Sequence, residues 1–198
     1  MKNLFWLPLD LPKFEYSNEI IVDFKGKFIP TNASAFLAQK LTEDGPPYAK
    51  SNWRNDLTAS QSKLKEYIDA HLPFDDIVNI KVHHPNSKGS LHIDFVVPKD
   101  NPEFFKHNEE NEPCGYRLVL SGARSGDLII KNSSGNQYPQ LPEDTDWYII
   151  GFTNVLHSIT HRCPNRYIIF CHGWINKEKH DIIINRSLEK YKDYAVWS

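Results

Sequence analysis

Residues 147–174 read WYIIGFTNVLHSITHRCPNRYIIFCHGW and contain two short stretches, 147–151 and 166–172, that are rich in Ile, Tyr and Phe. β-Branched and aromatic residues of this kind favour strands. Gly151 ends the first stretch, and Pro164 and Asn165 come just before the second; these residue types form turns. The segment therefore predicts two strands of an antiparallel sheet, with no helix between them.

Segments of the same character occur along the rest of the chain, and together they predict at least eight strands; the others are 20–24, 77–83, 91–97, 116–120, 127–131 and 181–185. The separators contain Pro, Gly, Asn and Ser and show no helical pattern, which argues against parallel βαβ units. Helical spacing is found mainly at 33–42 and 57–72, and 187–194 predicts a third helix. The fold class expected is α+β, mainly β, with N-terminal helices packed on an antiparallel sandwich.

Length and composition limit the classes of function. With 198 residues, one domain is expected over 1–198, in which 1–72 form a helical and mixed support and 75–185 the β core. The net charge of −2 offers no positive field for nucleic acid, and no stretch is apolar enough to span a membrane. Three cysteines without a CxxC pair fit a reducing compartment, so a cytoplasmic protein is expected.

The sequence SLHIDF at 90–95 places a histidine and an aspartate two residues apart in a predicted strand. Alternate residues of a strand point to one face, so His92 and Asp94 project together. An imidazole and a carboxylate suit a divalent first-row metal, and a second histidine completes the two-histidine, one-carboxylate triad of non-haem iron(II) oxygenases. A hydrogen-bonded surface pair would show the same spacing, so the third ligand decides between the two interpretations.

Two candidates for that ligand, His157 and His161, follow the apolar run at 147–151, and Arg166 begins the next apolar stretch. If His157 ends one strand, a turn through 163–165 lets His157 and Arg166 enter the same cavity. A guanidinium is the side chain that best binds the far carboxylate of 2-oxoglutarate, whose other end chelates iron. We favour His157 because it follows the apolar strand directly, and expect His161 to lie in a loop.

Taken together, His92-x-Asp94, the strand Arg117-Leu-Val-Leu-Ser121, His157 and the strand Arg166 to Trp174 resemble the iron(II)/2-oxoglutarate-dependent oxygenases of the aspartyl/asparaginyl β-hydroxylase type. The resemblance covers about residues 75–176. It implies a double-stranded β-helix, also called a jelly roll and shared with cupins. Members often have an acidic residue shortly before the terminal Trp, where this chain has His172-Gly173-Trp174.

The resemblance also implies the roles of individual residues. His92, Asp94 and His157 would be the iron(II) ligands, Arg166 would bind the distal carboxylate of the cosubstrate 2-oxoglutarate, and Arg117 would help to bind it. The activity implied is that of a dioxygenase that uses O2 to hydroxylate an amino acid, free or within a peptide or protein. Residues 1–70 are not assigned by the resemblance.

Two other functions stay open at this stage. The same sandwich is compatible with a cupin-like metal enzyme that uses no 2-oxoglutarate, or with a non-enzymatic jelly-roll module that binds a ligand through exposed aromatic residues. The chain has no GxSxG, Walker or GxGxxG motif, which argues against the corresponding hydrolases and nucleotide-binding proteins. His180 lies in a Lys-Glu-Lys segment, so we expect it to be solvated.

Overall fold

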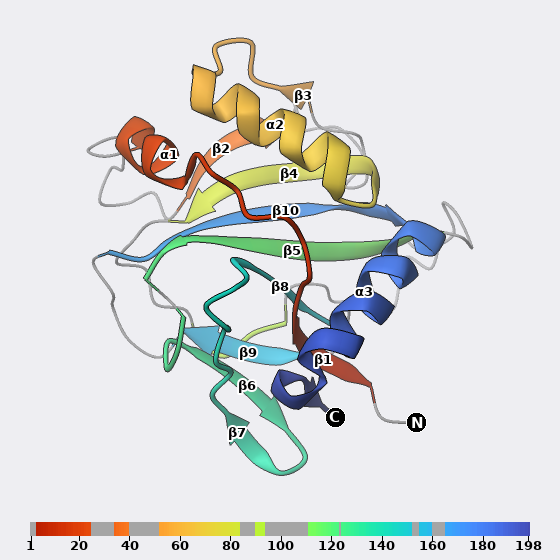
Figure 1. Ribbon diagram of the computed structural model, residues 1–198. Coiled ribbons are helices and arrows are strands. Elements are labelled where there is room, and N and C mark those ends of the chain that lie inside the picture. Colours follow the sequence, from red (N-terminus) through yellow and green to blue (C-terminus); the bar gives the residue numbers. More distant parts are fainter. Residues whose placement is uncertain are drawn as a thin grey trace, which may run out of the picture.

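A computed structural model describes residues 3–24, 34–39, 52–83, 90–93, 111–122, 124–151, 155–159 and 165–198. These ranges contain three α-helices, one 3₁₀-helix and eleven strands (Figure 1). The helices are α1 (Ser17–Phe24), α2 (Ala59–His71), α3 (Lys177–Tyr191) and the 3₁₀-helix η2 (Lys192–Tyr194). The strands are β1 (Leu4–Pro8), β2 (Ser34–Gln39), β3 (Asn52–Trp53), β4 (Phe74–His83), β5 (Asn111–Ser121), β6 (Leu128–Asn132), β7 (Gly135–Gln137), β8 (Trp147–Ile150), β9 (Leu156–Ile159), β10 (Tyr167–Asn176) and β11 (Val196–Trp197).

The strands form two antiparallel sheets. The larger has the order β11-β1-β8-β5-β10-β4-β2-β3, and the smaller has the order β7-β6-β9. A backbone bridge between His92 and His157 adds the 90–93 segment to the free side of β9. From β4 onward the chain alternates between the two sheets: β4, β5, β8 and β10 belong to the larger sheet, and the 90–93 segment, the β6–β7 hairpin and β9 belong to the smaller side.

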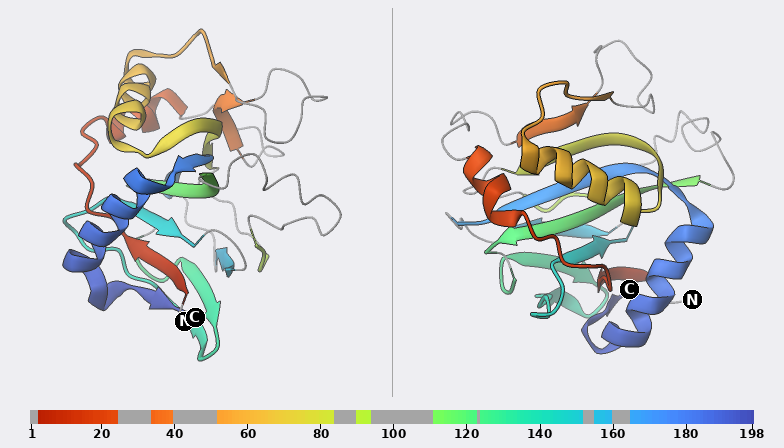
Figure 2. Two further views of the ribbon diagram at one scale, coloured as in Figure 1. Left: turned by 90° about the vertical axis from the view of Figure 1, so that its right-hand side faces the viewer. Right: turned by 45° about the horizontal axis from the view of Figure 1, so that its top comes forward.

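Two apolar clusters lie on opposite faces of the larger sheet. One buries outward-facing strand residues such as Tyr116, Trp147 and Ile169 against all three α-helices and the segment after β1. The other joins inward-facing residues such as Val119 to the smaller sheet. Figure 2 shows the helices on one side of the larger sheet and the smaller sheet on the other. The described residues therefore form a helix-covered β-sandwich, consistent with the predicted mainly β fold with antiparallel sheets.

The predicted helix at 57–72 and the strands at 77–83, 116–120, 127–131, 147–151 and 166–172 are confirmed within a few residues. α2 begins where the sequence provides a capping box: the Thr58 side chain accepts from the Gln61 backbone N–H, and the Gln61 side chain accepts from the Thr58 N–H. The C-terminal helix is longer than predicted, because α3 begins at Lys177 rather than 187. Of the predicted strand 91–97, residues 94–97 lie outside the described residues.

Three predicted elements are wrong. Residues 20–24 and 181–185 were expected as strands but belong to α1 and α3, where Ile20 and Phe24, and Ile183 with Ser187, are buried on one face of a helix. Residues 33–42 were expected as a helix, but 34–39 form β2, which pairs with β4. In each case the packing of a whole face decides the element, and the local preference of a few residues does not.

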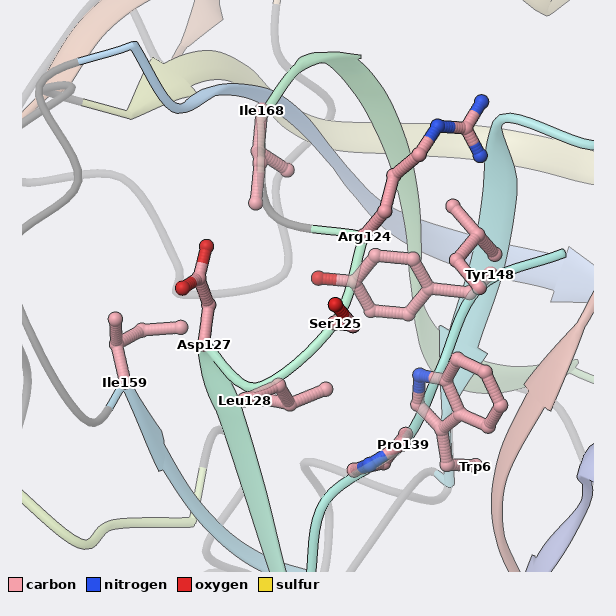
Figure 3. A pocket seen from close by; sticks show the side chains of 10 residues that line it. Trp6, Arg124, Ser125, Asp127, Leu128, Pro139, Tyr148, Ile159 and Ile168 are labelled. Carbon is pink, nitrogen blue, oxygen red and sulfur yellow. The ribbon is translucent and has the colours of Figure 1, made fainter. Parts of the chain in front are cut away.

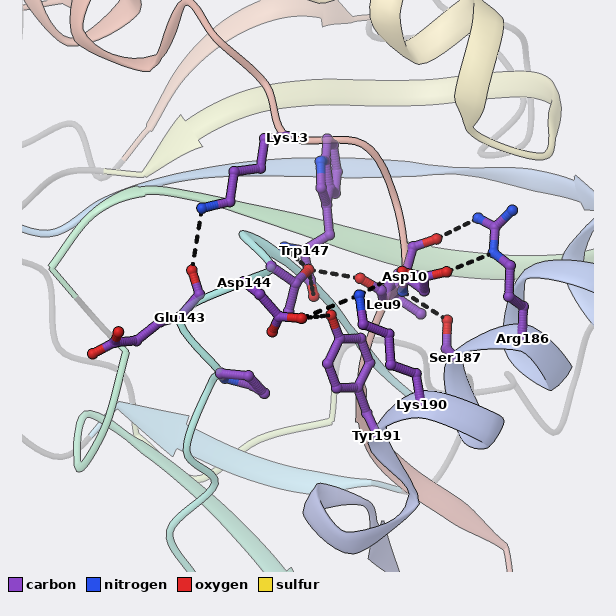
Figure 4. A network of polar contacts seen from close by, with 12 residues as sticks. Leu9, Asp10, Lys13, Glu143, Asp144, Trp147, Arg186, Ser187, Lys190 and Tyr191 are labelled. Atoms are coloured by element: carbon purple, nitrogen blue, oxygen red, sulfur yellow. Dashed lines mark hydrogen bonds and ion pairs between the residues drawn. The ribbon is translucent and has the colours of Figure 1, made fainter.

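A polar network fixes α3 to the segment after β1 (Figure 4). The Asp10 carboxylate forms ion pairs with Arg186 Nε at 3.0 Å and Lys190 Nζ at 2.9 Å. The Asp10 backbone N–H donates to Ser187 Oγ at 2.9 Å, and Ser187 is fully buried. No helix among the described residues is long and apolar enough to cross a membrane.

Candidate functional site

The structure brings His92 and His157 together. Their backbones exchange two hydrogen bonds, each with a donor–acceptor distance of 2.9 Å, from the N–H of one residue to the carbonyl oxygen of the other. Directly opposed residues of an antiparallel pair carry their side chains on the same face. The two imidazole rings accordingly lie side by side, with their centroids 4.6 Å apart.

Hydrogen bonds to the backbone set the tautomer of both rings. His92 Nδ1 lies 2.7 Å from the carbonyl oxygen of Ser90, and His157 Nδ1 lies 2.9 Å from that of Val155. A carbonyl oxygen only accepts, so each Nδ1 carries the proton when the ring is neutral. The lone pair of each imidazole is then on Nε2, as is required of a histidine that binds a metal through that atom.

The pair lies at the edge of the sandwich interior. His92 pairs with His157 on one side of β9. On the other side of β9, His157 pairs with Ile130 of β6, which is fully buried in the cluster between the two sheets. His157 itself is 4% exposed, whereas His92 is exposed to solvent. The arrangement therefore offers two neighbouring imidazoles, one inside the sandwich and one at its surface.

The third predicted metal ligand, Asp94, lies outside the described residues, two positions beyond His92. His161, the alternative to His157, lies outside them as well. Among the residues that the structure describes, no group of three or more His, Cys, Asp or Glu side chains is gathered as a metal site. The structure thus describes two members of the predicted triad.

Both predicted arginines are buried, each only 1% exposed, and they occupy different positions along the larger sheet. Arg166 immediately precedes β10, whereas Arg117 of β5 pairs with Phe170, four residues farther along β10. Four residues of strand span about 13 Å. Arg117 donates from Nη1 to the Gly115 carbonyl oxygen at 3.3 Å.

A pocket lies between the two sheets and is lined by residues of both (Figure 3). Ile159 of β9 and Ile168 of β10 both line it, and these two strands run in opposite directions (Figure 1). His157 lies two residues before Ile159 on β9, and Phe170 lies two residues after Ile168 on β10, so each points to the same side of its strand as the pocket-lining isoleucine.

Polar groups missed by the sequence analysis line the same pocket: Arg124, Ser125 and the buried Asp127. Arg124 donates from Nη1 to the carbonyl oxygens of Pro142 and Thr145, at 2.9 and 3.0 Å. The sequence predicted a turn around Arg124 and Ser125 and a strand that begins at Asp127. Neither the burial of Asp127 nor its place beside Ile168 has a signal in the local sequence.

Lys81 and Phe170 were also missed. Lys81 Nζ lies 5.6 Å from the centre of the Phe170 ring, which faces the interior. The alternation of Arg166, Ile168, Phe170 and His172 along a predicted strand is a signal that these four share a face. The position of Lys81 depends on the register of β4 against β10, which one strand's sequence does not contain.

Two further titratable residues lie on the helix-covered face. His180 was expected to be solvated, but it is 5% exposed and hydrogen-bonded through Nδ1 to the Tyr116 hydroxyl at 2.7 Å. Burial lowers the pKa of His180 to about 4, so its neutral form predominates at pH 7. Cys171 is fully buried, and burial raises the pKa of its thiol. Neither residue points toward the site.

No model of a known protein family matches the sequence, and no curated protein matches it either. Among solved structures, the crystal structure of AviO1 from Streptomyces viridochromogenes Tue57 shares 11% identity over 86% of this chain and 90% of that chain, with a TM-score of 0.43. The crystal structure of an oxidoreductase of the 2OG-Fe(II) oxygenase family from Burkholderia pseudomallei shares 14% identity over 80% of each chain, with a TM-score of 0.45. Because these similarities are low, we infer the chemistry of the site from its own residues.

Proposed function

We propose that this protein is a non-haem iron(II)- and 2-oxoglutarate-dependent dioxygenase that hydroxylates an amino acid, free or within a peptide or protein. The observation that carries the proposal is the His92–His157 pair. The two rings are 4.6 Å apart, and a backbone carbonyl oxygen holds Nδ1 of each. This leaves Nε2 as the coordinating atom of both residues, which fits the donor set of a non-haem iron site.

The order of the strands supports the proposal. The larger sheet contains β8-β5-β10-β4 and faces β7-β6-β9 with the 90–93 segment, and the chain alternates between the two sheets, as we would expect of a double-stranded β-helix. We propose that the strands from β4 to β10 form this fold; residues 177–185, which were expected to belong to the β core, lie in α3. Asp94, two positions beyond His92 in the sequence, is the third ligand in this proposal.

Each residue of the site has a defined role in the proposal. His92, Asp94 and His157 hold iron(II), which with 2-oxoglutarate and O2 supplies the oxidising power needed for an unactivated C–H bond. Arg166 binds the distal carboxylate of 2-oxoglutarate by a bidentate, permanently charged contact. The apolar residues that line the pocket between the sheets, among them Ile159 and Ile168, would exclude water from the reaction.

Anaerobic titration with iron(II) and 2-oxoglutarate tests the proposal. The complex should show the weak visible charge-transfer band of the chelate, and in air the protein should convert 2-oxoglutarate to succinate. His157→Ala should abolish the band, whereas His161→Ala, the matched control, should keep it. Absence of the band in the wild-type protein, together with no binding of 2-oxoglutarate, would favour a cupin-like metal enzyme or a binding module instead.

A further inference from the structure

Trp6 of β1 carries its side chain into the interior of the sandwich. Alternate residues of a strand point to opposite faces, so Leu7 is buried against the helices whereas Trp6 belongs to the cluster between the two sheets. The backbone of Trp6 pairs with Val196 of β11 on one side and with Ile150 of β8 on the other. Its ring packs against that of Tyr148, with the centroids 5.9 Å apart. Strand pairing and ring packing together fix the position of the indole.

The indole N–H of Trp6 is a buried donor without a partner. Trp6 is 2% exposed, and its Nε1 has no hydrogen-bond partner among the residues that the structure describes. An unpaired buried donor destabilises a fold, because it has given up its hydrogen bonds to water. A phenylalanine would pack in the same apolar cluster without that penalty. The N–H is therefore the part of this side chain that needs an acceptor, and a ligand can supply one.

This donor faces the pocket between the two sheets. Trp6 lines the pocket, and Figure 3 shows the indole nitrogen on the side of the ring turned toward the other lining residues. Most of these are apolar: Leu128, Pro139, Leu141, Ile159 and Ile168. Arg124 also lines the pocket, but it forms an ion pair with Asp146, and Figure 3 shows its guanidinium pointing away. The described lining therefore offers apolar walls and an unpaired N–H, and its cation already has a counter-charge.

The pocket adjoins the candidate metal site and opens to solvent. Ile159, which lines it, lies two residues after His157 on β9, and two residues of strand span about 7 Å. Ser125, another lining residue, is exposed, so a ligand can enter on that side. The enclosed part has room for about one water-sized group. One acceptor atom therefore fits inside, and the body of the ligand extends toward the open side.

We propose that this pocket is a subsite for the primary substrate, in which a neutral oxygen atom on an apolar group accepts a hydrogen bond from Trp6 Nε1. A carbonyl, hydroxyl or ether oxygen meets this description. A carboxylate does not, because one N–H donor in an apolar pocket does not offset the desolvation of a full charge. The inference rests on the proposed function only in naming the ligand as the substrate. Trp6, which lies outside the part of the chain covered by the family resemblance, is then a residue that determines specificity.

Nuclear magnetic resonance of the ¹⁵N-labelled indoles tests the subsite independently of activity. Each of the five tryptophans gives one indole N–H signal, and the signal missing from Trp6→Phe is that of Trp6. The probes, added to the metal-free protein, are cyclopentanone, cyclopentane as the same ring without the oxygen, and cyclopentanecarboxylate as an anion. We expect cyclopentanone to move the Trp6 signal downfield and to bind about tenfold more tightly than either of the other two.

Two variants and one control localise the binding, which the methyl signals of Ile159 and Ile168 report when the indole is changed. Trp6→Phe should weaken cyclopentanone about tenfold without weakening cyclopentane, because it removes the donor and keeps an apolar ring. Leu141→Phe should weaken both, because a larger side chain fills the pocket. Trp53→Phe, the same change in a tryptophan that does not line the pocket, should leave both affinities unchanged. Thermal unfolding of each variant verifies that it is folded.

Several results would overturn the subsite: no probe binds, ketone and hydrocarbon bind equally, the anion binds most tightly, or Trp6→Phe binds cyclopentanone like the wild type. Displacement of cyclopentanone by 2-oxoglutarate would also overturn it, because the pocket would then belong to the cosubstrate. The charge-transfer band keeps these outcomes separate from the proposed function. If the band forms in the wild type and in Trp6→Phe but the probes fail, the dioxygenase proposal stands and the subsite does not. If the probes bind as expected but no band forms, the pocket for a neutral acceptor stands and the dioxygenase proposal does not.

Discussion

Replacing His180 by asparagine should remove a large part of the acid sensitivity of this fold. His180 lies in the first turn of α3 on its buried face, with 5% of its surface exposed, and is hydrogen-bonded to Tyr116. Burial is the main cause that lowers its pKa, with a smaller contribution from Lys177, and the opposing effect of Asp181 is weaker than burial. Asparagine is neutral at every pH and retains an amide that can hydrogen-bond to the Tyr116 hydroxyl.

The size of the effect follows from linkage. The pKa falls from an ordinary 6.5 to about 4 in the folded protein, so between these values the unfolded chain binds more protons than the native one. Stability therefore falls as the pH is lowered. The contribution of His180 is fully present above pH 6.5 and is lost between pH 6.5 and about 4. The loss amounts to about 3 kcal/mol, since one pKa unit corresponds to about 1.4 kcal/mol.

Urea unfolding at several pH values between 7.5 and 4 measures the difference. Between pH 7.5 and 4, the unfolding free energy of His180→Asn should fall by about 3 kcal/mol less than that of the wild type. His71→Asn, at an exposed position near the end of α2, is the matched control and should follow the wild-type curve. If His180→Asn shows the same pH dependence as the wild type, the burial of a neutral imidazole on the inner face of α3 is refuted.

Three other changes test how the sandwich is assembled, each by urea unfolding at pH 7.5. Gly151→Ala places a methyl group 2.3 Å from the Leu4 carbonyl oxygen, which forces β1 away from β8 and should cost about 1–3 kcal/mol; unchanged stability would contradict this packing. Ser187→Ala removes the acceptor of the Asp10 backbone N–H and should lower the free energy of unfolding by about 1–3 kcal/mol. Ser187→Thr keeps a hydroxyl and should lower it by less. Thr58→Ala removes the N-cap of α2 and should cost about 1 kcal/mol without changing the binding of iron(II) or 2-oxoglutarate; a loss of binding would show that α2 and the site are coupled.

The strands around the site were predictable because their local patterns agree with their packing. In β8 and β10, β-branched and aromatic residues fill both faces of a buried sheet. The wrongly predicted segments are those in which the local sequence pattern and the packing disagree. The run Ile182, Ile183, Ile184 favours a strand locally, but the helical penalty of such residues is only a few tenths of a kcal/mol each. Burial of Ile183 and Tyr191 along one helix face outweighs it.

The candidate site likewise contains residues whose part in it could be predicted from the sequence and residues whose contacts could not. The spacing of His92 from His157 in the chain contains no information that the two rings meet, and the prediction that they do depended on a resemblance. The bridge between their backbones brings the two residues together. The contact of Lys81 and Arg117 with Phe170 could not be predicted, because it depends on the register of three strands that are far apart in sequence. The burial of His180 was missed because its charged neighbours face solvent while it points inward.

X-ray absorption at the iron edge tests most directly whether His92 and His157 bind one metal ion. The protein would be loaded anaerobically with iron(II) and 2-oxoglutarate, and the number of imidazole ligands determined from the extended fine structure. We expect two imidazoles in the wild type, one in His92→Ala, one in His157→Ala and two in His161→Ala. Two imidazoles in His157→Ala, or none in the wild type, would contradict this expectation.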